Sequence, residues 1–246
     1  LTTISKAKKL LKKFPRNSTI INLIGSCYNQ LGKPEEAKEQ FIIALQCNSN
    51  NLAAMNNLAN VYKNIKDYVN AEKLYKRIIE LEPKYLKAFV NYGNMCLHLN
   101  QIDEANQLYL LALKLDPKNE TILYNLAGVC QARGNFSKMK AYAEKLLENY
   151  PNNTDTDYLL SRVTNYNKEN IHFINMKNKI SNKSLNDKDK INLHFSLGKA
   201  YEDIFEYEES YRGLGHARSS PSVLQHLKIC SFDGWTDADR VAVVTL

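Results

Sequence analysis

Asparagine recurs at a matched interval along this chain. Asn57, Asn91 and Asn125 lie 34 residues apart, and Asn60 and Asn94 repeat that interval three residues further on. A side-chain amide offers one acceptor and two donors, so it can bond the N–H and the C=O of a peptide unit together. A row of such amides would follow an extended peptide backbone with little demand on its side chains. The spacing therefore predicts a peptide-binding surface; the alternative is that these are ordinary polar residues in an Asn-rich chain.

Other residues capable of chemistry form no recognisable site. Six residues separate Gly25 from Gly32 and Lys33, where a phosphate-binding Walker loop has four, and Pro34 replaces its Ser or Thr. The five histidines lack metal-ligand spacing, and the five cysteines include no C-x-x-C pair. The sequence therefore predicts no catalytic centre, cofactor or metal. Isolated thiols of this kind are typical of small buried groups in a reducing, cytoplasmic setting.

The same interval of 34 residues organises the helices that would carry the asparagines. Pro83, Pro117 and Pro151 are spaced by 34 residues, and proline cannot continue a helix, so each indicates the end of a repeat. Aligned on this period, the chain contains four full repeats: residues 18–51, 52–85, 86–119 and 120–153.

Small and large residues recur at fixed positions, counted from the first residue of each repeat. Small residues let two helices approach closely, and a large ring fills the space beside them. Position 8 is Gly25, Ala59, Gly93 and Ala127; position 20 is Ala37, Ala71, Ala105 and then Met139; position 24 is Phe41, Tyr75, Tyr109 and then Ala143.

This register resembles the tetratricopeptide-repeat (TPR) signature across residues 1–153. The resemblance implies an all-α, right-handed solenoid of antiparallel helix hairpins, in which the first helix of each repeat, helix A, lines a concave groove. The predicted groove residues are Asn22, Asn57, Asn60, Lys87, Asn91, Asn94, Tyr124 and Asn125.

The asparagines also resemble the ladder in the TPR superhelix of O-linked N-acetylglucosamine transferases, although Leu23 departs from that pattern in the first repeat. A carboxylate clamp of the chaperone-binding kind fits less well. Asn22, Asn57 and Lys87 match the clamp. Ser26 and Asn91, however, replace the asparagine and the arginine that the clamp requires.

The sequence outside these repeats is less regular. Residues 1–17 resemble the second helix of a truncated repeat, and residues 154–212 read as degenerate TPR-like helices. Within them, residues 193–211 are similar to the TPR stretch of bacterial TPR-linked sulfotransferases. Residues 213–246 contain no asparagine and several Gly, Ser and Pro residues, which predicts an irregular tail. A foreign or frame-shifted terminus is one explanation of this change in composition.

The net charge of +7 is concentrated at one end. Residues 1–16 supply +6 with no acid, and their apolar residues follow helical spacing. We interpret this segment as an amphipathic helix with a solvated basic face; a patch for anionic lipid or nucleic acid is the alternative. No stretch is long and apolar enough for a membrane span, and no secretory signal is visible.

We therefore expect a cytoplasmic scaffold that binds a protein or an extended peptide, with no nucleic acid or membrane partner and no catalysis of its own. The alternative is that the chain is the accessory region of a larger sulfotransferase or glycosyltransferase.

Overall fold

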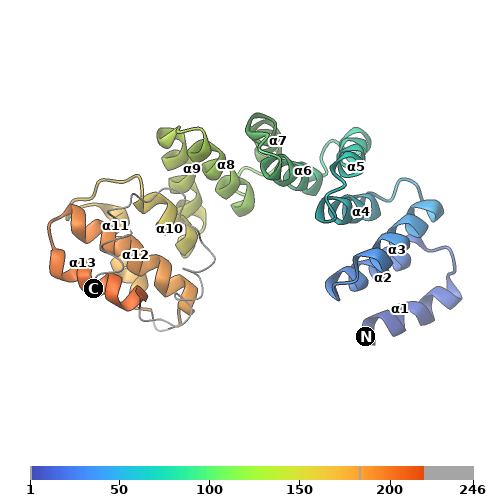
Figure 1. The fold of residues 1–246 in the computed structure, drawn as a ribbon, viewed down its shortest axis with the longest axis horizontal. Coiled ribbons are helices and arrows are strands. Elements are labelled where there is room, and N and C mark those ends of the chain that lie inside the picture. The colour runs from blue at the N-terminus through green and yellow to red at the C-terminus, as the bar shows by residue number, and fades with distance from the viewer. Residues whose placement is uncertain (1, 183, 219–246) are drawn as a thin grey trace. The chain divides into compact units, whose positions relative to one another are not determined.

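The computed structural model describes residues 2–182 and 184–218, and every regular element in these ranges is a helix (Figure 1). The predicted all-α class is therefore confirmed. The chain divides into two compact units, residues 1–139 and residues 140–246, called here the N-terminal and the C-terminal unit.

The N-terminal unit consists of helices that pack in sequence order. Its elements are α1 (Thr2–Lys13), α2 (Ser18–Gln30), α3 (Pro34–Cys47), α4 (Leu52–Asn64), α5 (Tyr68–Leu81), α6 (Leu86–His98), α7 (Ile102–Leu115), α8 (Glu120–Ala132) and the start of α9 (Phe136–Asn149). From α1 to α8, each helix contacts the next along the chain, and α4 also contacts both α2 and α6. The first helices of the first three repeats therefore contact their counterparts, and a hydrogen bond from Asn125 on α8 to Asn94 on α6 continues this row of helix A surfaces.

Asparagine also begins most of these first helices. Asn51 precedes α4, and its Oδ1 accepts the N–H of Ala54 at 3.0 Å. Asn17, Asn119 and Asn153 cap α2, α8 and α10 in the same way. An N-cap side chain satisfies an amide that the first helical turn leaves without a partner. Part of the asparagine content of this chain therefore serves helix capping.

One turn geometry joins the two helices of each repeat. After helix A, position 15 has a positive φ in every repeat: 70° at Gly32, 65° at Lys66, 58° at Asn100 and 68° at Gly134. The next N–H then reaches back to a carbonyl of the last helical turn, as from Asp67 to Tyr62 at 2.8 Å. This is the Schellman arrangement, which ends a helix and reverses the chain.

The close helix approach predicted for position 8 is present. A Cβ added to Gly93 would lie 2.7 Å from the ring of Tyr109, and one added to Gly25 would lie 2.6 Å from the ring of Phe41. Both rings are buried. The helices of a repeat are therefore held at a distance that the small residue sets and the ring fills.

The C-terminal unit has shorter and less regular helices. They are the remainder of α9, α10 (Thr154–Ser161), α11 (Ile171–Ile180), α12 (Asp187–Asp203) and α13 (Tyr207–Arg218). α12 packs against α10, α11 and α13. A buried cluster that includes Phe173, Met176, Leu193 and Leu197 forms its core.

The hairpin of α12 and α13 has the turn of the N-terminal repeats. Counted with Gly198 at position 8, Phe205 falls at position 15, where its φ is 62°. The N–H of Glu206 donates to the carbonyl of Tyr201 at 2.9 Å, as the equivalent amides do in the N-terminal unit. This hairpin therefore has the turn geometry of a repeat although its sequence has diverged.

The start of the predicted irregular tail is corrected by α13. This helix continues through Gly213 and Gly215 to Arg218, so residues 213–218 are helical. A Cβ on Gly213 would lie 3.6 Å from the carbonyl oxygen of His194 on α12. The glycine therefore faces a close helix contact and does not end the helix. The remaining residues of the predicted tail, 219–246, lie outside the described residues.

Candidate peptide-binding surface

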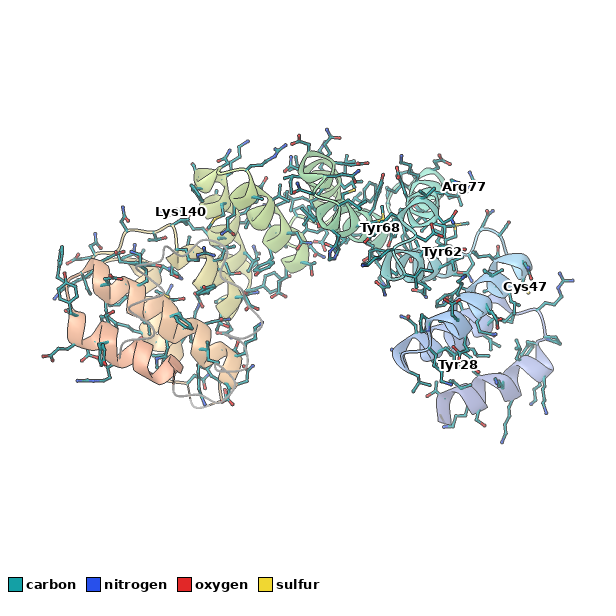
Figure 2. All side chains as sticks on the ribbon, viewed as in Figure 1. Tyr28, Cys47, Tyr62, Tyr68, Arg77 and Lys140 are labelled. Atoms are coloured by element: carbon teal, nitrogen blue, oxygen red, sulfur yellow. The ribbon has the colours of Figure 1, made fainter. Side chains whose placement is uncertain are left out.

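The predicted groove residues all lie on first helices of the N-terminal unit. Asn22 is on α2; Asn57 and Asn60 are on α4; Lys87, Asn91 and Asn94 are on α6; Tyr124 and Asn125 are on α8. The six asparagines are half-buried, whereas the lysine and the tyrosine are exposed. Figure 2 shows the side chains of this unit along the helices.

Hydrogen bonds link three of these asparagines to the preceding repeat. Nδ2 of Asn57 donates to Oδ1 of Asn22 at 3.0 Å, and Nδ2 of Asn91 donates to Oδ1 of Asn56 at 2.9 Å. Nδ2 of Asn125 also donates to the preceding repeat, but its acceptor is Oδ1 of Asn94, at position 9 and not position 5, at 3.0 Å. The 34-residue spacing in the sequence thus becomes a chain of amide contacts between successive repeats.

The other half of each amide faces no described partner. Within residues 2–182 and 184–218, no hydrogen bond is made by Oδ1 of Asn57, Asn91 or Asn125. The oxygens are therefore oriented acceptors whose Nδ2 groups are already committed to the protein. A backbone N–H could bond to each of them, which is half of the two-sided recognition that the sequence predicted.

Asn60 and Asn94 have a structural role that the sequence analysis did not predict, and their place in the groove stays a prediction. Their Oδ1 atoms accept the hydroxyls of Tyr75 and Tyr109 at 2.7 Å and 2.6 Å. Burial raises the pKa of both tyrosines, so each hydroxyl stays protonated and donates. A buried hydroxyl without an acceptor would lower the stability of the fold, and these asparagines supply the acceptor.

The sequence held a signal for this role. Position 9 and position 24 vary together: asparagine accompanies tyrosine in the second and third repeats, whereas the first pairs Ser26 with Phe41 and the fourth pairs Gly128 with Ala143. Sequence reasoning also missed Asn56, which is 6% exposed and accepts the hydrogen bond from Asn91.

A second polar cluster joins the second and third repeats away from the amide row. The hydroxyl of Tyr92 lies 3.1 Å from Glu72 and 2.7 Å from Glu104. Burial, together with the charges of Glu104 and Glu72, raises the pKa of the nearby Cys96 thiol to about 12. Cys96 is therefore a neutral thiol at physiological pH, which argues against a nucleophilic role.

The C-terminal unit contains a buried ionic network that no sequence pattern indicated. Both carboxylate oxygens of Asp157 accept the Nζ of Lys179 at 2.7 Å, and Nε2 of His172 lies 2.9 Å from the same carboxylate. The hydroxyl of Tyr166 is 2.8 Å from Nδ1 of His172. The Asp157 side chain is fully buried. We interpret this network as a structural tie between α10 and α11, because a reactant could not reach the carboxylate without local opening.

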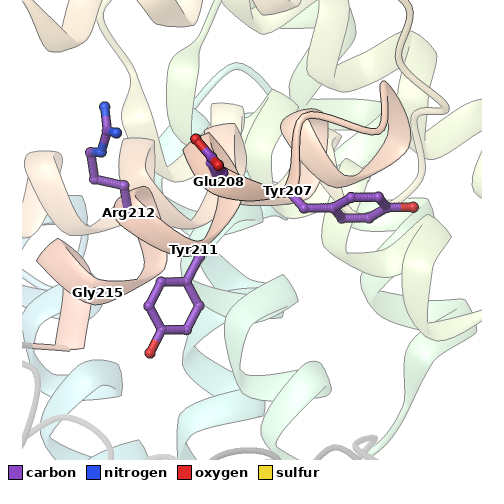
Figure 3. A pocket seen from close by; sticks show the side chains of 5 residues that line it. All are labelled: Tyr207, Glu208, Tyr211, Arg212 and Gly215. Carbon is purple, nitrogen blue, oxygen red and sulfur yellow. The ribbon is translucent and has the colours of Figure 1, made fainter.

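A hollow of about 810 Å³ lies along α13 (Figure 3). Its described lining residues, among them Tyr207, Tyr211 and Arg212, all come from that single helix. Side chains of one helix surface do not converge on a point, so we assign no site to it.

Two kinds of feature are absent from the part of the chain that the structure describes. It has no group of three or more His, Cys, Asp or Glu side chains positioned to hold a metal ion. None of its helices combines the length and the apolar character that crossing a bilayer requires.

Family models of the tetratricopeptide repeat match this chain. Models described as tetratricopeptide repeat match residues 18–51, 52–85 and 122–153, and one described as TPR repeat matches residues 93–134. Two curated relatives are both called uncharacterized protein ycf37. The one from Pyropia yezoensis is 38% identical over 64 residues, and the one from Porphyra purpurea is 31% identical over 78 residues. These matches cover 26% and 30% of this chain, and only 36% and 45% of the relatives.

Solved structures share the fold at low identity. The C-terminal part of a TPR protein from Cytophaga hutchinsonii has a TM-score of 0.67 at 15% identity, with 90% of this chain and 92% of that one covered. Pseudomonas aeruginosa pilF has a TM-score of 0.63 at 19% identity, with 87% and 98% covered. YrrB, described as a TPR protein with an unusual peptide-binding site, has a TM-score of 0.55 at 13% identity. The match covers 85% of this chain and 97% of YrrB. None of these relatives is named as a sulfotransferase, so the resemblance of residues 193–211 stays a prediction.

Proposed function

Because the chain belongs to the tetratricopeptide-repeat family, we propose that the helix A surfaces of its N-terminal unit bind an extended peptide segment of a protein partner. The observation that carries the proposal is the row of acceptors on Asn57, Asn91 and Asn125. Each amide is fixed by a bond from Nδ2 to the preceding repeat, and each Oδ1 has no described partner. Fixed acceptors bind with less loss of side-chain entropy than mobile ones.

The amide row favours recognition of backbone over side chains. A backbone N–H recurs along any extended peptide, so acceptors at equivalent places on successive repeats can bond it whatever the sequence. Nδ2 of Asn22 has no described partner either, because only its Oδ1 is used by Asn57, and it can donate to a peptide carbonyl. Lys87 is exposed on α6 and can contact a side chain or a carboxylate, and Tyr124 is exposed on α8. Peptide binding by YrrB supports this proposal by analogy of fold. We further propose that the chain performs no catalysis.

The test is a titration of peptides selected from a random displayed library against the intact chain. Replacement of Asn57, Asn91 and Asn125 by Ala removes three hydrogen bonds of about 0.5–1.5 kcal/mol each, so affinity should fall by roughly 13- to 2,000-fold if the bonds act independently. The loss should be similar for peptides of different side-chain sequence and should change little with salt, because neutral groups make the contacts.

A matched control removes three amides from second helices instead. Gln40 on α3 and Asn106 and Gln107 on α7 make no described hydrogen bond, and their replacement by Ala should leave affinity unchanged. Thermal unfolding of both triple variants separates a binding loss from a folding loss, since Nδ2 of the row also ties repeats together. Equal affinity of the groove variant and the wild type, both folded at the assay temperature, would rule the proposal out.

A further inference from the structure

A second hollow, of about 590 Å³, lies between α1 and the turn from α2 to α3. Its lining includes Ile4, Lys8, Lys9, Lys12, Tyr28 and Leu31. Figure 2 labels Tyr28 at this end of the molecule. None of the predicted groove residues lines it. We call it the lysine hollow.

Three of the four lysines that line the lysine hollow have no described counter-charge. Residues 1–16 contain no acid, and no described carboxylate forms a salt bridge with Lys8, Lys9 or Lys12. Lys33, which also lines the hollow, pairs with Glu36 at 3.4 Å. Three lysines on about one and a half turns of one helix therefore present an unneutralised positive field to an open cavity.

The equivalent helix of the second repeat gives a contrast, because it carries two cations at the same places and pairs both of them with acids. When the chain is aligned on its 34-residue period, Lys8 and Lys9 correspond to Lys76 and Arg77 on α5. There, Glu72 pairs with Lys76, and Glu80 lies 3.3 Å from Arg77. On α1 the places of these two acids are taken by Ile4 and Lys12. The two acids that pair with these cations on α5 are therefore missing from α1.

An apolar wall lies beside these charges. Leu31 is 49% exposed and Tyr28 is half-buried, and Ile4 adjoins them. Nζ of Lys8 lies 5.9 Å from the centroid of the Tyr28 ring, a cation–π distance that holds the lysine at the rim of the wall. A fitting ligand combines an apolar side chain, which would cover Leu31 and Tyr28, with carboxylates on either side of it.

We propose that the lysine hollow is a second binding site, separate from the amide row, for an acidic peptide segment that carries one apolar anchor side chain. The local extent of the hollow and its apolar wall favour a side chain over a nucleic acid, which requires a basic track with aromatic groups in series. They likewise favour a compact anchor over a lipid surface, which would contact charges along a whole helix face.

The test uses fluorescein-labelled peptides of the form EEXEE, with X varied over the apolar and polar residues, and the intact chain. Anisotropy should show tight binding for X = Phe or Leu, weaker binding for X = Ser, and none for the KKXKK counterparts. Lys8→Glu with Lys12→Glu should weaken binding of EEFEE by at least about tenfold, since it replaces attraction by repulsion. Leu31→Ser should reduce the preference for Phe over Ser and leave the dependence on salt intact.

The matched control reverses two other exposed charges of the same helix. Lys6→Glu with Lys13→Glu alters net charge equally, but neither residue lines the hollow, so the expected loss is under about threefold at physiological salt. Replacement of Asn57, Asn91 and Asn125 by Ala should not affect EEFEE binding, which keeps this result independent of the amide row.

Four outcomes of the peptide experiments would overturn the proposal: no EEXEE peptide binds, EESEE binds as tightly as EEFEE, both charge-reversal pairs lose affinity equally, or Leu31→Ser changes nothing. Vesicles that contain phosphatidylserine and a single-stranded oligonucleotide complete the series. Tighter capture of either probe than of EEFEE, lost in the Lys8 and Lys12 variant, would assign the hollow to that class of partner instead.

Discussion

The two units of this chain solve the same packing problem with different interactions. In the N-terminal unit, neutral groups at fixed positions hold the helices together. A small residue packs against a ring, as Gly93 packs against Tyr109, and an asparagine amide accepts the hydrogen bond of the ring's hydroxyl. In the C-terminal unit, the contact between α10 and α11 is centred on the buried carboxylate of Asp157 with Lys179 and His172.

This difference has consequences for tolerance to change. Each repeat of the N-terminal unit contacts its neighbours through the same positions, so a local defect can be absorbed by the repeats on either side. The ionic network of the C-terminal unit occurs once among the described residues, and its parts depend on one another. A buried charge is stable only while its partner is present, so the loss of one member is costly.

The largest expected effect is therefore that of Asp157→Ala. This change leaves the ammonium of Lys179, whose side chain is 13% exposed, without its carboxylate, and should cost about 3–5 kcal/mol of unfolding free energy. Chemical denaturation followed by circular dichroism measures the loss. Hydrogen exchange should show it in α10 and α11, with α2 to α7 still protected.

Two variants sharpen this test. Glu80→Ala breaks an exposed pair in the N-terminal unit, where the Glu80 side chain is 66% exposed, and should change stability by less than about 1 kcal/mol. Asp157→Asn combined with Lys179→Met removes both charges and should recover much of the stability that Asp157→Ala loses. A loss below about 1 kcal/mol for Asp157→Ala would show that the network is not what holds the C-terminal unit together.

An intermediate effect is expected from the small residues of the N-terminal unit. Gly93→Ala places a Cβ 2.7 Å from the Tyr109 ring and should destabilise by about 1–3 kcal/mol through overpacking, partly offset by better helix propensity. Gly128→Ala on α8 is the matched control, because its added Cβ has no atom within 4 Å. It should stabilise by up to about 1 kcal/mol. Thermal midpoints that move in the same direction in both variants would contradict the close-approach account.

The sequence predicted those features that depend on local spacing. Proline and small-residue spacing located the helix pairs, and the interval between Asn57, Asn91 and Asn125 placed them on matching faces. Which atoms of each amide are occupied could not be predicted, because Asn57 comes within 3.0 Å of Asn22, and Asn91 within 2.9 Å of Asn56, only when successive repeats stack. The paired variation of positions 9 and 24 was readable, and it would have shown that Asn60 and Asn94 support tyrosines.

The Asp157 network was beyond sequence reasoning for a physical reason. His172 and Lys179 lie seven residues apart on α11, which puts them on one face, but their common partner is on α10, across residues 162–170. The path of such an irregular connection is set by tertiary packing and leaves no period in the sequence.

The smallest expected effect concerns a feature that both units share, the turn at position 15. Phe205 has a φ of 62°, which a bulky side chain adopts at a cost of order 1–3 kcal/mol, and its side chain is 76% exposed, so little packing compensates. Phe205→Gly should therefore raise stability by about 0.5–1 kcal/mol after the entropic cost of glycine is included. Lys66→Gly makes the same change in the N-terminal unit, at a φ of 65°, and should give a similar gain. Thermal unfolding of both variants, with hydrogen exchange to locate the effect, gives the comparison. A gain at Lys66 with a loss at Phe205 would mean that the contact of Phe205 with Tyr207, with ring centroids 6.2 Å apart, stabilises α13, and that the turn of the C-terminal unit is maintained for that aromatic pair.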